Sequence, residues 1–258
     1  LRAKQTVTLQ LDVRNTFSRG PVTCRNIVAE IPGSTHPEEI VILSAHLDSW
    51  DLGTGAADDG FGVAAVLAAA EAIQRSGLRP ARTLRFVLFT GEEQGLLGSR
   101  AYVKQHAQEL DRIQAVFALD WGAGPVTKFG TAGHPELLPL LREINKLAPD
   151  LGLEAPDETC LYMTDAYAFT LAGLPGIAPT VKSAAYSEQG HSAQDTLDKV
   201  PPADLLQAST VLTLAGWHLA NSPASSPVRF TSAQTAASLT TGNQKPMLQV
   251  SGFWPFGN

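Results

Sequence analysis

The chain has 258 residues, and its 19 lysine and arginine residues against 25 aspartate and glutamate residues give a formal net charge of -6. This length is enough to bury a full hydrophobic core in one domain. The acidic balance argues against a nucleic-acid partner, because no basic stripe is present to replace the counterions of the phosphates. No run of about 20 apolar residues occurs, so we expect no membrane span.

The chain opens with LRAKQTV, not with a methionine and an apolar signal core. We interpret it as the mature or trimmed form of a longer product and predict secreted or periplasmic localisation. The two cysteines, Cys24 and Cys160, lie far apart and are predicted to be free, and their spacing excludes a cysteine zinc site. The sequence leaves the oligomeric state open, a homodimer included.

Strand-like and helix-like segments alternate along the chain. Apolar residues alternate with polar ones over residues 7–13, which predicts a half-exposed strand with residues 26–31 as its neighbour. Further strands are predicted from apolar runs at 40–46, 83–90, 115–120 and 174–181. Helices are predicted at 60–76, 96–110, 135–148, 165–173 and 203–220. This order predicts an α/β fold, a three-layer αβα sandwich whose mixed, mostly parallel, twisted central sheet has helices on both faces.

The chain is expected to form one domain over residues 1–220, followed by a tail over residues 221–258. The tail is rich in Ser, Thr, Ala, Gly and Pro, a composition that resembles a linker or a surface wrap. Phe253, Trp254 and Phe256 are the candidates for pinning its end to the domain.

Ligand-type side chains stand at or just after the ends of three predicted central strands. They are His46, the pair Glu92 and Glu93, and Asp120. In open α/β sheets, ligands bind outside the carboxyl ends of the strands. Carboxylates buried at a sheet edge are costly unless cations compensate them. The sequence therefore predicts a metal site at this edge, with an exposed acidic turn as the alternative for the two glutamates.

Two aspartates near His46 have predicted roles. Asp58 lies among glycines where a loop enters the alanine-rich helix, so its backbone can approach an ion and its two oxygens can bridge two cations. The alternative for Asp58 is a helix N-cap, for which Asp59 is the better candidate. Asp48 shares a strand face with His46, so its carboxylate is predicted to accept the second imidazole proton, unless it is a solvated turn residue.

The adjacent glutamates point in different directions, so one can bind metal while the other serves as a general base for the attacking water. His191, in the polar loop GHSAQDT, would by itself be a surface histidine more often than a ligand. Its assignment depends on the need for another neutral donor. The other histidines are interpreted as structural: His36, His106, His134 and His218.

Taken together, these segments resemble the co-catalytic zinc exopeptidases, which include secreted bacterial aminopeptidases and plasma glutamate carboxypeptidase (carboxypeptidase Q). The shared pattern is HLDS at 46–49, GAxDD at 55–59, EEQG at 92–95, a strand ending in Asp120, and a histidine followed by Asp-Thr at 191–196. The wording HLDSWD leans toward the carboxypeptidase Q side of the family.

The resemblance implies two Zn²⁺ ions per chain, replaceable by other divalent transition metals, in a peptidase catalytic domain at 1–220. His46 and Asp120 would hold one ion, Glu93 and His191 the other, and Asp58 would bridge them. Glu92 would be the general base, and Asp48 would orient His46. The implied activity is hydrolysis of peptide bonds near a free terminus, with aminopeptidase, dipeptidase and carboxypeptidase specificities left open.

Many aminopeptidase relatives carry Ser-Asp-His near the substrate, whereas this chain has Thr164, Asp165 and Ala166. Asp165 stays a candidate substrate-binding residue, together with Tyr162, which stands out of clear register with a carbonyl-polarising tyrosine of some relatives. One alternative function is a single-zinc acyltransferase of the glutaminyl cyclase type, and another is a receptor-like member without activity. A Rossmann-type nucleotide binder fits poorly, because no GxGxxG follows the first buried strand.

Overall fold

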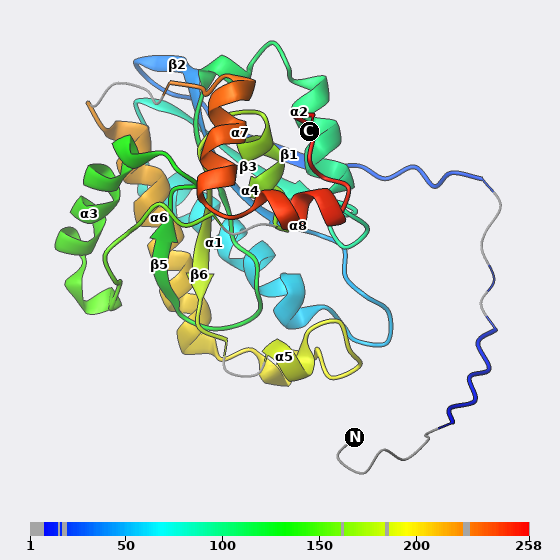
Figure 1. Cartoon of the computed structure of the whole chain (residues 1–258). Coiled ribbons are helices and arrows are strands. Elements are labelled where there is room, and N and C mark those ends of the chain that lie inside the picture. Colours follow the sequence, from blue (N-terminus) through cyan, green and yellow to red (C-terminus); the bar gives the residue numbers. More distant parts are fainter. Residues whose placement is uncertain are drawn as a thin grey trace.

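The computed structural model describes residues 8–14, 16, 20–160, 163–183, 186–223 and 228–257. A six-stranded sheet at its centre has the order β1-β3-β2-β4-β6-β5 (Figure 1). The strands are β1 (Ile27–Ile31), β2 (His36–His46), β3 (Arg82–Phe89), β4 (Ile113–Ala118), β5 (Val126–Gly130) and β6 (Gly176–Val181). Strands β3, β2, β4 and β6 run parallel, whereas the edge strands β1 and β5 are antiparallel to their neighbours. The predicted mixed, mostly parallel sheet is confirmed.

Helices lie on both faces of this sheet, as Figure 1 shows. They are α1 (Phe61–Ser76), α2 (Leu97–Gln105), α3 (Leu138–Leu147), α4 (Asp165–Leu171), α5 (Tyr186–Gln189), α6 (Pro202–Asn221), α7 (Ser232–Thr241) and α8 (Lys245–Val250). Gly77 ends α1 in the left-handed region (φ 70°), as its position predicted. None of the described helices combines the length and the apolar character that crossing a membrane requires.

Strand β2 shows why continuous apolar runs in the sequence predict a sheet with helices on both faces. Its alternate residues belong to different hydrophobic clusters. Leu43 packs in a cluster that includes residues of α1 and α6, while Ile42 packs in a second cluster that includes residues of α2 and α4. Because successive side chains of a strand point to opposite faces, a strand buried on both faces has to be continuously apolar.

The register of the parallel strands fixes where the polar residues lie. His46, the last residue of β2, is level with Phe89 at the end of β3, and Ser44 is level with Ala118 at the end of β4. The loops after these three strands therefore leave the sheet at one edge. This is the edge at which the sequence predicts the metal site.

The predicted strand over residues 7–13 is wrong for its described part. Residues 8–14 form no strand, and the side chains of Leu9, Leu11 and Val13 are exposed. Figure 1 shows this segment leaving the domain beyond β1. An amphipathic strand needs a neighbour to pair its backbone and cover its apolar face, and nothing in the described part of the chain lies there. Val7 falls outside the described residues.

The tail predicted as a linker or surface wrap contains α7 and α8. Helix α7 begins with a capping box in which Thr231 and Gln234 satisfy each other's backbone amides. Phe253, Trp254 and Phe256 pack against a small hydrophobic cluster, so the aromatic residues do hold the end of the chain on the domain. Strand β5 was not predicted from the sequence, since no element was expected at residues 126–130.

Candidate metal centre

His46 and Asp120 meet at the sheet edge. The Nε2 atom of His46 lies 3.0 Å from Oδ1 of Asp58 and 3.8 Å from Oδ1 of Asp120. On the other side of the ring, Nδ1 lies 2.9 Å from the backbone carbonyl oxygen of Asp48. A carbonyl only accepts hydrogen bonds, so Nδ1 carries the proton and Nε2 is the atom that can bind a metal.

Asp58 occupies the central position. It lies in the turn Ala56–Gly60, and its side chain is buried. Its Oδ1 faces His46, while its Oδ2 lies 3.1 Å from Nε2 of His191. The two oxygens of one carboxylate therefore point toward two different imidazoles, which is the arrangement needed for a bridging ligand.

Two groups of potential ligands share this carboxylate. The first is His46, Asp58 and Asp120, and the second is Asp58, Glu93 and His191; within each, the candidate ligand atoms all lie within 4.8 Å of one another. Imidazole nitrogen and carboxylate oxygen are the donors that zinc accepts in catalytic sites. In both groups, the donor set fits a divalent transition metal.

The turn that carries Asp58 is held by two neighbouring aspartates. Asp195 accepts hydrogen bonds from the amides of Ala57 (2.6 Å) and Asp58 (3.0 Å), one with each oxygen. Asp59 accepts hydrogen bonds from the amides of His46 (3.1 Å) and of Gly62 in the first turn of α1 (3.0 Å). The helix-capping role predicted for Asp59 is met only in part, because its carboxylate accepts the hydrogen bond from Gly62 but the N-cap residue of α1 is Gly60. Asp195 links the segment of His191 to the turn of Asp58.

Asp48 acts differently from its prediction. Its carboxylate lies 3.9 Å from Nδ1 of His46, too far for a hydrogen bond. The carboxylate instead accepts the amides of Glu92 (3.1 Å) and Glu93 (3.3 Å), while the backbone carbonyl of Asp48 meets the ring. Asp48, whose side chain is partly buried, thus ties the turn after β3 to the end of β2 through the amide donors nearest to its carboxylate.

One carboxylate oxygen of Glu93 is paired and the other is not. Its Oε2 lies 3.0 Å from Nε2 of His191 and accepts the indole N–H of Trp50 at 2.7 Å. Its Oε1 is buried and has no hydrogen-bond partner among the described residues. Such an oxygen is unfavourable unless a cation compensates it.

The electrostatics of the site agree with this reading. Burial, reinforced by the charge of Asp120, raises the pKa of Glu92 to about 9. Burial and the charge of Asp58 raise the pKa of Glu93 to about 7. Burial alone would lower the pKa of His46, but the neighbouring carboxylates of Asp120 and Asp58 outweigh it and raise the pKa. Without cations, the site holds protons that its carboxylates would otherwise lose.

The two predicted substrate-binding residues have different outcomes. Tyr162 lies outside the described residues. Asp165 is the first residue of α4 and is only 2% exposed. Burial raises the pKa of its carboxyl group to about 7, and neither oxygen has a hydrogen-bond partner among the described residues. Asp165 therefore lies buried next to the site, and its side chain is not exposed for contact with a substrate.

Two aromatic residues of the site were missed. The hydroxyl of Tyr186 donates to Oδ2 of Asp58 at 2.8 Å, and the indole of Trp50 donates to Glu93. Tyr186 lies five residues before His191, which is too weak a signal to separate it from a surface tyrosine. Trp50 was noticed only as part of the wording HLDSWD. Both contacts join loops that are distant in the sequence.

Two of the remaining histidines stack on aromatic rings. His106 stacks on Tyr102 with ring centroids 3.9 Å apart, and the buried His134 stacks on Phe230 at 4.0 Å. Both sequence-predicted free cysteines are free.

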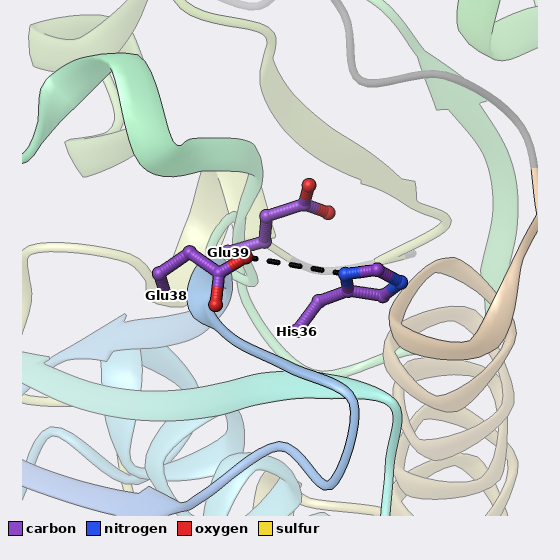
Figure 2. Close-up of side chains that lie close together, drawn as sticks. All are labelled: His36, Glu38 and Glu39. Carbon is purple, nitrogen blue, oxygen red and sulfur yellow. Dashed lines mark ion pairs between the residues drawn. The ribbon is translucent and has the colours of Figure 1, made fainter.

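A third group of metal-type side chains lies at the other end of β2. Figure 2 shows His36, Glu38 and Glu39, with the dashed line marking the 3.9 Å ion pair of His36 and Glu38. His36 and Glu38 are more than half exposed, and Glu39 accepts a hydrogen bond from Arg82. These contacts describe a surface ion pair, so the group carries no metal assignment.

Fold and site together define a three-layer α/β protein with a buried metal-binding centre at the carboxyl edge of its sheet. The model of Peptidase family M28 matches residues 26–215, and the chain belongs to this family. Carboxypeptidase Q of Xenopus laevis is 36% identical over 200 residues, which cover 76% of this chain and 42% of that protein. The human carboxypeptidase Q is 34% identical over 199 residues, covering 76% and 41%. The chain thus spans about two fifths of the length of these relatives.

Solved structures resemble the chain in the same region. A Peptidase M28 precursor from Shewanella amazonensis SB2B has a TM-score of 0.73 and 38% identity over 80% of this chain and 47% of that chain. A zinc aminopeptidase from Bacillus subtilis has a TM-score of 0.64 at 24% identity, covering 80% and 52%. A glutaminyl cyclase from an Acidobacteriales bacterium has a TM-score of 0.58 at 22% identity, covering 76% and 73%. The last two likenesses concern the fold.

Asp195 offers a test of how the bridging carboxylate is held. The variant Asp195→Asn keeps one acceptor oxygen but replaces the other with an amide group that cannot accept a hydrogen bond. We expect zinc affinity to fall by about 10- to 100-fold, because outer-shell partners fix the ligands. Competition with a chromophoric chelator measures this affinity. The matched control is Asp198→Asn in the same segment, where the exposed carboxylate pairs with Lys199. Equal zinc affinity of the two variants would contradict the role of Asp195.

The raised pKa values predict how stability depends on pH after a chelator has removed metal. Glu92 and Glu93 titrate near 4.5 when unfolded, but at about 9 and about 7 when folded. Between these values the folded state binds more protons than the unfolded state, so its stability falls as pH rises. Urea unfolding of the metal-free protein at pH 5, 7 and 9 measures the trend, which Glu92→Gln should weaken. Stability that rises over this window would contradict the assigned burial of these groups.

Proposed function

We propose that this chain is the catalytic region of a two-zinc metallo-exopeptidase, which hydrolyses peptide bonds near a free terminus. The observation that carries the proposal is the shared carboxylate of Asp58, whose oxygens face both ligand groups. His46 and Asp120 would hold one ion, and Glu93 and His191 the other. Bound zinc would supply Lewis-acid chemistry, lowering the pKa of water and polarising the scissile carbonyl.

Glu92 is the proposed general base. It stands next to the ligand Glu93, belongs to neither ligand group and is buried beside Asp120. Its carboxylate would take a proton from the attacking water and then deliver that proton to the leaving amine. Asp48 supports this step by holding the backbone of Glu92 and Glu93. The positive charge of bound cations would bring the pKa of Glu92 down from its metal-free value, so that it is ionised before the reaction.

Aromatic side chains surround the proposed reaction site. Trp50 and Trp121 are partly exposed, and Trp50 lies 5.9 Å from the ring of His191, while Trp121 lies 6.1 Å from the ring of Tyr186. Their exposed faces offer apolar surface to a peptide. The hydroxyl of Tyr186, 2.8 Å from Asp58, stands where it can donate to an oxygen near the bridging carboxylate.

Two other functions remain as alternatives. A single-zinc acyltransferase of the glutaminyl cyclase type shares the fold, and it would use one ligand group only. A receptor-like member would be expected to lose ligands or the base. The complete ligand set and the presence of Glu92 favour the hydrolase. Secreted or periplasmic localisation, the boundary at residue 220 and the absence of a nucleic-acid partner stay predictions.

Substitution of the base separates binding from turnover. Glu92→Gln keeps the size of the side chain but cannot take a proton, so zinc should stay near two per chain while kcat falls by about two orders of magnitude or more. Elemental analysis and peptidase assays measure the two quantities. The control Glu71→Gln changes an exposed glutamate of α1 that pairs with Arg75, and should leave both unchanged. Unimpaired turnover in Glu92→Gln would rule this residue out, and one zinc per chain would favour the cyclase-type alternative.

A panel of blocked substrates tests the exopeptidase assignment. We expect the zinc-loaded protein to cleave a free dipeptide and to leave intact a peptide that is blocked at both termini. A peptide blocked only at its amino terminus and one amidated only at its carboxyl terminus then distinguish carboxypeptidase from aminopeptidase action. Products are identified by mass spectrometry. Cleavage inside the doubly blocked peptide would contradict the assignment.

A further inference from the structure

The turn over residues 91–97, which carries Glu92 and Glu93, adopts a demanding backbone conformation. The amides of Gly95 and Leu96 both donate to the carbonyl of Glu92, at 2.8 and 2.9 Å, and the amide of Leu97 donates to Gly91 at 2.9 Å. Leu96 has φ 57°, in the left-handed region that L side chains rarely adopt. Contacts elsewhere must hold such a residue in place.

Those contacts come largely from the end of the chain. Leu96 is fully buried in a small cluster with Tyr167 of α4, Leu239 of α7 and Leu248 of α8. The side chains of Phe253, Trp254 and Phe256 pack around the same cluster. Two of the other three buried members of this cluster therefore belong to the last two helices.

An aromatic ring also lies directly on the turn. A Cβ atom added to Gly95 would lie 3.6 Å from Cζ of Phe253, which is an ordinary van der Waals contact. The guanidinium of Arg100, on α2 just after the turn, lies 5.1 Å from the centre of the same ring. This distance permits a cation–π interaction. Phe253 thus covers the side of the turn that Gly95 leaves open.

The last part of the chain is itself well anchored. The amide of Phe230 donates to the carbonyl of Gly173 at 2.8 Å, and its ring stacks on His134. After α8, the amides of Phe253 and Trp254 donate to the carbonyl of Leu248 at 2.8 and 3.0 Å. Residues of α7 and α8 share a hydrophobic cluster with Tyr167 of α4, and Figure 1 shows both helices near α4. The match to the peptidase family ends at residue 215, ahead of this whole segment.

We propose that residues 228–257, the C-terminal segment, position the proposed base and its neighbouring ligand by packing on Leu96. Leu248 and Phe253 are the positioning residues. Their packing stabilises the left-handed conformation of Leu96 and thereby the conformation of the turn. This turn keeps Glu92 and Glu93 in position at the candidate metal centre. The inference rests on the proposed function for its effect on catalysis, but its structural part concerns the turn alone.

The test compares two leucine-to-alanine substitutions, each of which leaves a cavity in a different hydrophobic cluster. Leu248→Ala removes apolar volume from the cluster that contains Leu96, whereas Leu141→Ala opens a cavity on α3, in the large cluster on the opposite face of the sheet. Val250→Ala, at an 87% exposed position of the same helix, is the control for α8. Assays are run well below the unfolding temperature of each variant. Leu248→Met, which restores apolar volume, is the conservative rescue.

In Leu248→Ala, we expect kcat to fall by between about 10- and 100-fold with KM nearly unchanged, because a small displacement of a reacting group is enough for such a loss. Leu248→Met should recover most of the rate, and Leu141→Ala and Val250→Ala should keep it. Phe253→Leu, a milder change, should lower kcat in the same direction if Leu248→Ala proves too unstable to study.

Hydrogen exchange gives a readout that is independent of peptidase activity. The amides of Gly95, Leu96 and Leu97 should exchange faster in Leu248→Ala and Phe253→Leu, with exchange in Leu141→Ala unchanged at these positions. If the exchange rates of these amides are the same in all variants, the positioning role is overturned. If they rise in a protein that cleaves no peptide, the proposed function fails while the structural inference stands.

Discussion

Negative charge gathered at a buried sheet edge is the constraint on which this site depends. Asp58, Asp120, Glu92 and Asp165 are all buried there, with Glu93 beside them, against the imidazoles of His46 and His191. Isolated ionised carboxylates are strongly disfavoured away from water, so either protons or cations must accompany them. The raised pKa values of Glu92, Glu93 and Asp165 express the first solution. The proposed pair of divalent cations around Asp58 would be the second, and it would leave Glu92 free to exchange a proton.

The acidic residues of the site divide into two kinds by what their oxygens meet. The carboxylates of Asp48, Asp59 and Asp195 accept hydrogen bonds from backbone amides. These hydrogen bonds fix the loops that carry the other acidic residues. Asp58 and Glu93 turn their oxygens toward imidazoles instead. This division explains why Asp48, two residues from a metal-type histidine, is a poor ligand candidate. It also explains how several carboxylates can lie close together while only some of them need a cation.

Most of the site could be predicted from the sequence because its residues are tied to local patterns. His46 and Asp120 follow apolar runs, and the parallel register brings the ends of those runs to one edge. The contacts that sequence could not supply are long-range ones. Tyr186 reaches Asp58 across 128 positions, and whether the ring of His46 meets the carboxylate or the carbonyl of Asp48 depends on the path of the loop. The composition of the tail hides its helices, because α7 consists mostly of serine, threonine and alanine and depends on its capping box and its packing for stability.

The turn that carries Asp58 and the turn that carries Glu92 and Glu93 differ in the contacts that hold them. Asp58 is fixed by directional hydrogen bonds, since Asp195 takes the amides of its turn within a buried environment. Glu92 and Glu93 stand at the start of a turn, where the carboxylate of Asp48 accepts hydrogen bonds from their amides. The other end of this turn, at the left-handed Leu96, lies in the apolar cluster that includes Tyr167, Leu239 and Leu248. Hydrogen bonds to a carboxylate define positions within tenths of an ångström, whereas apolar packing defines them through volume and tolerates substitutions that preserve it. The proposed base therefore stands on a turn that is held by hydrogen bonds at one end and by apolar packing at the other. Its geometry can change through packing residues that touch neither metal nor substrate.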